Sequence, residues 1–135
     1  MTSLLLFLVL TVLTLPFVCA QLQITTHPSH IDAQLGSTAI LNCSFTLEVT
    51  PVDPAQVHVI WKKEGTKVLS YMGNMEVQRP GAQLSEQVLT QGDASLTLPN
   101  LTRSDSGKYS CSIRLASEQD TQTITLAVND YRQIG

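Results

Sequence analysis

The strongest constraint on this chain is the signature D-x-G-x-Y-x-C, which is formed by Asp105, Gly107, Tyr109 and Cys111. Gly107 can adopt backbone conformations that other residues avoid, so we expect a turn to end there. Beyond the turn, alternate residues of a strand face the same side. The signature therefore predicts a strand with Tyr109, Cys111, Ile113 and Leu115 on one face, and Lys108, Ser110, Ser112 and Arg114 on the other.

Two upstream segments complete this pattern. One is an alternating strand in which Ala39, Leu41, Cys43 and Phe45 share a face, and the other is a strand with Val57, Val59 and Trp61 on one side. A cystine that joins two sheets beneath a tryptophan, with a tyrosine two residues before the second cysteine, is the core of the immunoglobulin sandwich. The pattern predicts an all-β fold, an immunoglobulin variable-type (V-set) β-sandwich with two antiparallel sheets and one inter-sheet disulfide. Its expected core residues are Trp61, Tyr109, Asp105 and Gly107.

Residues 1–20 are expected to form a secretory signal peptide. This segment carries no charge, and its apolar run is interrupted only by threonines and Pro16. Val18 and Ala20 stand at the −3 and −1 positions of a cleavage site. A membrane anchor is the competing interpretation, but Pro16 and the shortness of the run disfavour it.

The cysteine count follows from this leader. Cys19 would leave with the signal peptide, so the mature chain would keep only Cys43 and Cys111. An oxidising compartment should join this pair as a disulfide. The bond would close a loop of about seventy residues, which is worth roughly 4 kcal/mol on the chain-entropy model. A metal site or a reactive thiol would need partners that two widely separated, inward-facing cysteines lack.

The mature chain has the length of one domain, residues 21–130, followed by a short C-terminal stub, residues 131–135. Alternation, proline and glycine indicate strands at residues 21–35 (broken at His27-Pro28), 37–45, 57–63, 66–72, 75–78, 83–89 and 94–98, then a strand after the corner at 99–106, and a last strand at 121–128. The two extra strands between residues 63 and 83 favour a variable-type over a constant-type sandwich.

No stretch of some twenty apolar residues follows Val128. We therefore expect either a secreted single domain or the first part of a longer protein, attached to a membrane only through a segment absent from this chain. The net charge of −3 argues against a phosphate-binding surface, so no nucleic-acid partner is expected.

The run RPGAQLSEQVLTQGDASLTLPNLTRSDSGKYSCSI, residues 79–113, resembles the membrane-distal variable domain of the butyrophilin and T-cell costimulatory-ligand family. GDASLTLPNL is its most distinctive part, and the segment HVIWKKEGTKVLSY is similar as well. The spacing between Arg79-Pro80-Gly81-Ala82 and Gly92-Asp93-Ala94-Ser95-Leu96 most resembles the tumour-expressed ligand of a natural killer cytotoxicity receptor. Many variable domains pair the aspartate of the signature with an arginine at the start of the fourth strand. The nearest arginine is Arg79, and the sequence leaves open whether it reaches Asp105.

The resemblance implies a protein-binding surface on the outer face of the sheet that contains the strands at 57–63 and after the corner. Alternation exposes Ile60, an apolar residue, amid polar neighbours. On the next strand, either Leu69 and Tyr71 or Val68 and Ser70 join it, depending on register. We assign to this candidate partner-binding surface His58, Ile60, Lys62, Tyr71, Ser112, Arg114 and Thr123. The alternative interpretation is that one exposed isoleucine reflects ordinary strand propensity.

Other candidate sites are weaker. Residues 115–120 would form the loop where antigen receptors read their ligands, but no glycine-rich bulge follows it. His27, His30 and Asp32 could be drawn as a metal site on a kinked edge strand, although solvent-facing polar residues are the simpler reading. No serine lies in a nucleophile-elbow sequence. We predict no enzyme activity, no catalytic residues, no metal and no cofactor.

Two sequons are present. Asn100-Leu101-Thr102 lies at the expected corner, so glycosylation of Asn100 is predicted, with a turn asparagine as the alternative. Asn42-Cys43-Ser44 includes the disulfide cysteine, so poor use is expected there.

Together these features predict an extracellular recognition module, the membrane-distal V-type domain of a cell-surface immune ligand or receptor that modulates lymphocyte activation. Its expected partner is a protein receptor on another cell. The alternatives are homophilic cell adhesion through a homodimer, and a secreted decoy.

Overall fold

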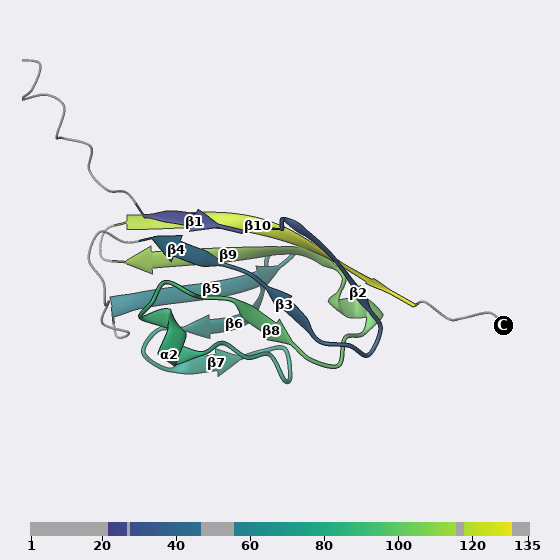
Figure 1. Cartoon of the computed structure of the whole chain (residues 1–135). Coiled ribbons are helices and arrows are strands. Elements are labelled where there is room, and N and C mark those ends of the chain that lie inside the picture. Colours follow the sequence, from purple (N-terminus) through teal and green to yellow (C-terminus); the bar gives the residue numbers. More distant parts are fainter. Residues whose placement is uncertain (1–21, 27, 47–55, 116–117, 131–135) are drawn as a thin grey trace, which may run out of the picture.

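Alternating apolar residues build two layers of strands that pack face to face in the computed structural model (Figure 1). The structure describes residues 22–26, 28–46, 56–115 and 118–130. The expected signal peptide, most of the segment between the second and third expected strands, and the C-terminal stub lie outside the described residues.

The larger layer is a six-stranded sheet whose order is β2-β10-β9-β5-β6-β7. Its strands are β2 (His30–Gln34), β10 (Glu118–Asn129), β9 (Gly107–Leu115), β5 (Val57–Lys63), β6 (Thr66–Tyr71) and β7 (Met75–Val77). All neighbours are antiparallel except β2, which runs parallel to β10. The presence of β6 and β7 confirms the predicted variable-type arrangement.

The second layer consists of two strand pairs, β1 (Gln23–Thr25) with β4 (Ser44–Thr46), and β3 (Ala39–Leu41) with β8 (Leu96–Leu98). The predicted strand at 37–45 is therefore present in two parts, β3 and β4. The opening strand is also divided, because β1 belongs to this layer whereas β2 belongs to the larger sheet. Pro28 lies between the two parts, as expected for a residue that cannot donate to a ladder.

The strand predicted at 83–89 is wrong. Gln83 makes an isolated bridge with Thr97, and the chain then forms a helical turn, α2 (Glu86–Leu89). Leu84 and Leu89 are both buried, although their odd spacing would put them on opposite faces of a strand. The turn brings both leucines into the core, and this packing overrides the strand propensity of the segment.

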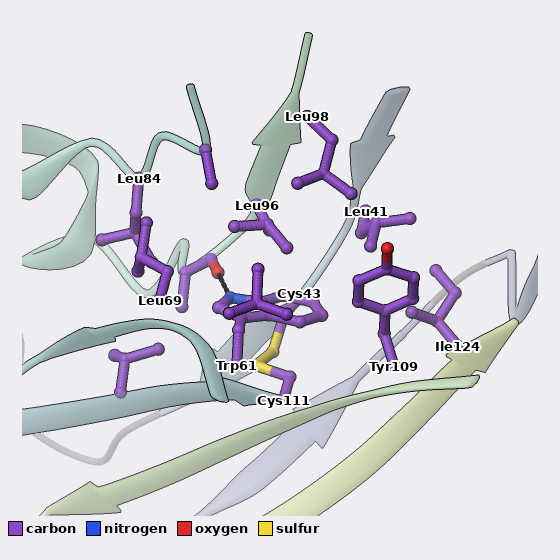
Figure 2. Close-up of a cluster of buried hydrophobic side chains, with 14 of the residues drawn as sticks. Leu41, Cys43, Trp61, Leu69, Leu84, Leu96, Leu98, Tyr109, Cys111 and Ile124 are labelled. Carbon is purple, nitrogen blue, oxygen red and sulfur yellow. Dashed lines mark hydrogen bonds between the residues drawn. A yellow bond between two sulfur atoms is a disulfide. The ribbon is translucent and has the colours of Figure 1, made fainter. Parts of the chain in front are cut away.

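The centre of the sandwich is the predicted disulfide between Cys43 and Cys111, whose Cα atoms are 6.6 Å apart (Figure 2). Trp61 lies against it, is fully buried, and donates a hydrogen bond of 2.9 Å from Nε1 to the Ala94 carbonyl. The hydroxyl of Tyr109 donates to the carbonyl of Asp105 at 2.5 Å. Each polar atom that these rings bring into the core therefore has a partner.

The structure also shows that Arg79 reaches Asp105. Its Nη2 lies 2.8 Å from Oδ2 of Asp105, and its Nε donates to Oδ1 at 3.1 Å. Asp105 is buried and closes a capping box with Thr102 at the 3₁₀ turn η2 (Arg103–Asp105). Burial by itself would raise the pKa of Asp105, but the hydrogen bonds from Arg79 and Thr102 outweigh it and hold that pKa below its ordinary value.

Candidate protein-binding surface

The outer face of the six-stranded sheet has Ile60 at its centre. Ile60 on β5 lies opposite Ser112 of β9 on one side and opposite Ser70 of β6 on the other. The row continues to Thr121 of β10 and to Glu76 of β7. One line of outward residues thus crosses five strands, with a single half-buried aliphatic side chain at its middle.

The hydroxyl groups beside Ile60 are small or already paired. Oγ of Ser112 lies 2.9 Å from Oγ1 of Thr121, within hydrogen-bonding distance. Ser70 is only 3% exposed, so it presents little polar surface. Because these groups need few hydrogen bonds from a partner, water can be removed from the middle of the sheet at a low cost in free energy.

A second row lies next to the first. His58 of β5 is paired with Arg114 of β9, which is paired in turn with Gln119 of β10. Met72 follows directly after β6 and is 53% exposed. A shallow hollow of about 130 Å³ is lined by His58, Ile60, Met72, Ser112, Ile113, Arg114 and Gln119, of which Ile113 is fully buried. The accessible apolar side chains at this depression are therefore those of Ile60 and Met72, inside a polar rim.

The assignment of Tyr71 to this surface is wrong. Tyr71 is 3% exposed and lies opposite Val59, an inward residue of β5, so it belongs to the core. The register shifts between the pairs Trp61–Leu69 and Lys62–Lys67, which leaves Val68 as an extra residue on β6. The sequence left open whether Tyr71 or Ser70 lies beside Ile60 on the outer face. The structure places Ser70 there.

The remaining predicted residues lie on the same sheet. Lys62 is paired with Ser110, and Ser110 with Thr123, so these residues form a third row beside Ile60. Sequence reasoning missed Met72, Glu76 and Gln119. Alternation from Ser70 would have found Met72, whereas Gln119 was assigned to a loop.

That loop assignment is also wrong. β9 and β10 remain paired as far as Leu115 and Glu118, so most of the segment predicted as a loop at 115–120 is strand. Continued pairing satisfies backbone groups that a loop would leave to water. The result is a longer outer face, to which Gln119 contributes.

Charge on this sheet differs in sign from the chain as a whole. The chain has a net charge of −3. The exposed cationic residues of the sheet are Lys62, Lys67, Lys108 and Arg114. Its exposed acidic residues are Asp32, Glu76 and Glu118, and the Glu118 carboxylate already accepts a hydrogen bond from the N–H of Leu22. The centre around Ile60 is therefore flanked by mostly positive charge, which would attract a partner with an acidic surface.

The described residues offer no group of three histidine, cysteine or acidic side chains that could hold a metal ion. His30 Nε2 lies 3.4 Å from Oδ1 of Asp32, and His27 lies outside the described residues. In the described parts of the chain, no helix has the length and apolar character needed to span a bilayer.

The family model for the immunoglobulin V-set domain matches residues 26–128. The chain belongs to the immunoglobulin V-set family. This match confirms the fold that Cys43, Cys111, Trp61 and Tyr109 predict. Domains of this family occur in immune and adhesion-type proteins of the cell surface, and they bind other proteins rather than catalyse reactions.

Several curated proteins are similar to this V-set chain. It is 37% identical over 114 residues to Tapasin-related protein of Mus musculus, covering 80% of this chain and 25% of the relative. It is 32% identical to Endothelial cell-selective adhesion molecule of Macaca fascicularis, covering 81% and 31%. It is 30% identical to Programmed cell death 1 ligand 1 of Mus musculus, covering 75% and 37%. The chain thus spans well under half the length of these relatives.

Solved structures share the V-set fold. The human B7-H4 IgV-like domain superposes with a TM-score of 0.68 at 23% identity, covering 79% of this chain and 96% of that one. Bovine butyrophilin superposes with a TM-score of 0.68 at 21% identity, covering 81% and 55%. Both proteins fall within the families that the run at residues 79–113 resembles.

Proposed function

We propose that this chain is an extracellular recognition module that binds a protein receptor on another cell through the outer face of its six-stranded sheet, and that this contact modulates lymphocyte activation. The observation that carries the proposal is the apolar centre formed by Ile60 and Met72 inside a rim of polar and cationic residues. Such a patch suits a protein contact of modest affinity.

In this function, residues 1–20 would act as a cleaved leader that directs the chain into the secretory pathway. Residues 21–130 would then form the membrane-distal domain of a larger cell-surface protein. The support for a larger protein is that the curated relatives are much longer than their match to this chain. The support for an immune ligand is the similarity to Programmed cell death 1 ligand 1.

The first test is a matched pair of substitutions, Ile60→Asp and Ile40→Asp. Ile60 lies at the centre of the proposed surface, whereas Ile40 is 54% exposed on β3 of the opposite layer. Fluorescent tetramers of each variant would be used to stain lymphocytes of the source species, after thermal unfolding has shown that both variants fold. We expect Ile60→Asp to abolish staining and Ile40→Asp to preserve it. Unchanged staining by Ile60→Asp would refute the proposed surface.

The charge of the rim gives a second test. If Lys62 and Arg114 steer an acidic partner, the association rate should fall as ionic strength rises, and Arg114→Glu should slow association at low salt. A salt-independent association rate would argue against electrostatic steering. Plate-bound domain in a T-cell activation assay would then reveal the direction of the signal.

Homophilic adhesion is a second candidate function, favoured by the similarity to an endothelial adhesion molecule. In that case the same face would pair with a second copy of itself. Sedimentation of the purified protein over a range of concentrations separates the two functions, because only adhesion requires dimers that Ile60→Asp disrupts.

A further inference from the structure

The corner between β8 and η2 carries the sequon Asn100-Leu101-Thr102. Asn100 is exposed, and no hydrogen bond or ion pair engages its side chain in the described structure. Its backbone has a φ of 51°, one of two positive values among the non-glycine residues that the structure describes. The acceptor amide therefore stands at the tip of a tight turn with its polar atoms unoccupied.

We propose that Asn100 is the N-glycosylation site of this protein. The inference rests on the extracellular placement proposed above, but not on the binding surface. An asparagine two residues before a threonine, with a middle residue other than proline, is the acceptor sequence for N-linked sugar on a surface loop of a secreted protein. The side chain of Asn100 meets both the sequence and the exposure requirement.

The surroundings of Asn100 leave room for a sugar. Leu101 is buried and its N–H donates 3.0 Å to the carbonyl of Ser37, so the turn is anchored from below. Beside Asn100 lies an open hollow lined in part by Pro80, Gly81 and Pro99. The first sugar residue can therefore lie against proline rings without displacing any described hydrogen bond of Asn100.

The position of the turn keeps the sugar away from the proposed binding surface. Asn100 belongs to no strand of the six-stranded sheet. The adjoining turn η2 lies at the end of the sandwich where the chain leaves β10 (Figure 1), and Arg103 pairs there with Asp130 at 3.2 Å. A glycan on Asn100 would project from this end and leave the outer face around Ile60 bare.

The second sequon is a poorer candidate. The middle residue of Asn42-Cys43-Ser44 is half of the disulfide, and Asn42 already makes an interaction in the folded chain. Asn100 and Thr102 also have folding roles, since asparagine tolerates positive φ and Thr102 caps η2. The test variant must therefore remove the acceptor amide while preserving the turn, and Asn100→Gly does so because glycine accepts a φ of 51°.

The experiment is translation of the full chain in the presence of microsomal membranes, with wild type, Asn100→Gly and Asn42→Gln compared. Protease protection reports translocation, and a gel shift removed by endoglycosidase H reports modification. We expect all three chains to be protected, with one removable shift in wild type and Asn42→Gln and none in Asn100→Gly. Peptide mass spectrometry would locate the sugar.

Two results would overturn the inference. A protected wild-type chain without a removable shift, or with a shift that only Asn42→Gln abolishes, would refute modification of Asn100 and leave the proposed function intact. A wild-type chain that stays accessible to protease would refute both the modification and the extracellular placement.

Discussion

Asp105 shows how much of the sandwich can depend on one carboxylate. It accepts two hydrogen bonds from Arg79 and two from Thr102, and its own carbonyl accepts one from Tyr109. Arg79 in turn donates to the carbonyls of Pro80 and Pro99. The ion pair therefore ties the segment before α2 to the corner before β9, and both partners are mostly shielded from water.

Replacing Asp105 by asparagine tests this role. Because a partly buried guanidinium would lose its charged partner, we expect Asp105→Asn to lower the free energy of unfolding by about 2–3 kcal/mol at pH 7. The pKa of Asp105 is depressed in the folded state, so its contribution is present above the unfolded value of about 3.9 and is lost as pH falls through the folded value. Urea denaturation from pH 6 to pH 2 should therefore show a steeper acid loss in wild type than in the variant. Asp32→Asn, which removes a carboxylate at an exposed position, is the control for the loss of one negative charge.

Among the elements, the chain that follows α2 contacts β4 at Gly92, a position with no room for a side chain. A Cβ on Gly92 would lie 2.4 Å from the carbonyl oxygen of Phe45, and Gly92 has a φ of +92°. The carbonyl of Gly92 also accepts a hydrogen bond from the Phe45 N–H at 2.8 Å, so β4 cannot move away without losing that bond. Gly65 has a similar φ of +81° but nothing within 4 Å of its would-be Cβ.

These two glycines form a matched pair. We expect Gly92→Ala to destabilise the domain by about 2–4 kcal/mol, because backbone strain and a clash with backbone act together, and Gly65→Ala by about 1 kcal/mol from strain alone. Thermal unfolding of both variants measures the difference. Equal losses would mean that β4 shifts freely, and would contradict the contact described here.

The short strand β1 is held on its second edge by side chains. Glu118 and Asp120 of β10 accept hydrogen bonds of 3.0 Å from the backbone N–H groups of Leu22 and Ile24. Removing the Glu118 carboxylate should accelerate hydrogen exchange of the Leu22 amide about fivefold, and removing that of Asp120 should do the same for the Ile24 amide, since one such bond contributes about 1 kcal/mol. Exchange measured by NMR in Glu118→Ala and Asp120→Ala would show this, with Gln122→Ala, an exposed neighbour on β10, as the unaffected control. Equal exchange of these amides in all three variants would contradict the role of the two carboxylates in holding β1.

At the scale of the elements, the sequence predicts the strands that follow from local residue patterns. It does not predict the features that depend on tertiary packing. Alternation and glycine placement were sufficient for β5, whose bounds agree with the predicted 57–63, and for the core positions of Trp61 and Tyr109. They failed where packing decides. The burial of Leu84 and Leu89 turned a predicted strand into α2, and the extra residue Val68 set the register that buries Tyr71. The partner of Asp105 was likewise visible only once Arg79 was placed in space.

Considered as a whole, the molecule separates its two tasks. The second layer and the inward face of the large sheet provide the packed core, whereas the proposed surface lies on the opposite face of that sheet (Figure 1). Since alternate residues on one strand serve different faces, Trp61 and its neighbour Ile60 can be substituted for different purposes. Changes at Ile60 should affect binding, and changes at the core should affect stability.

In the described part of the chain the disulfide is the covalent cross-link between the layers, and its removal is the test of stability at the scale of the molecule. The double substitution Cys43→Ala and Cys111→Ala should lower the free energy of unfolding by about 2–5 kcal/mol, because the unfolded chain regains the freedom of a long closed loop. That is a large share of the 5–15 kcal/mol typical of such domains. Urea denaturation should show a lower midpoint and a steeper dependence on denaturant, since the unlinked chain exposes more surface when it unfolds. Reduction of the wild type should reproduce both changes. If the midpoint fell in the variant but not on reduction, the loss would come from the cavities left by the two sulfur atoms rather than from the cross-link.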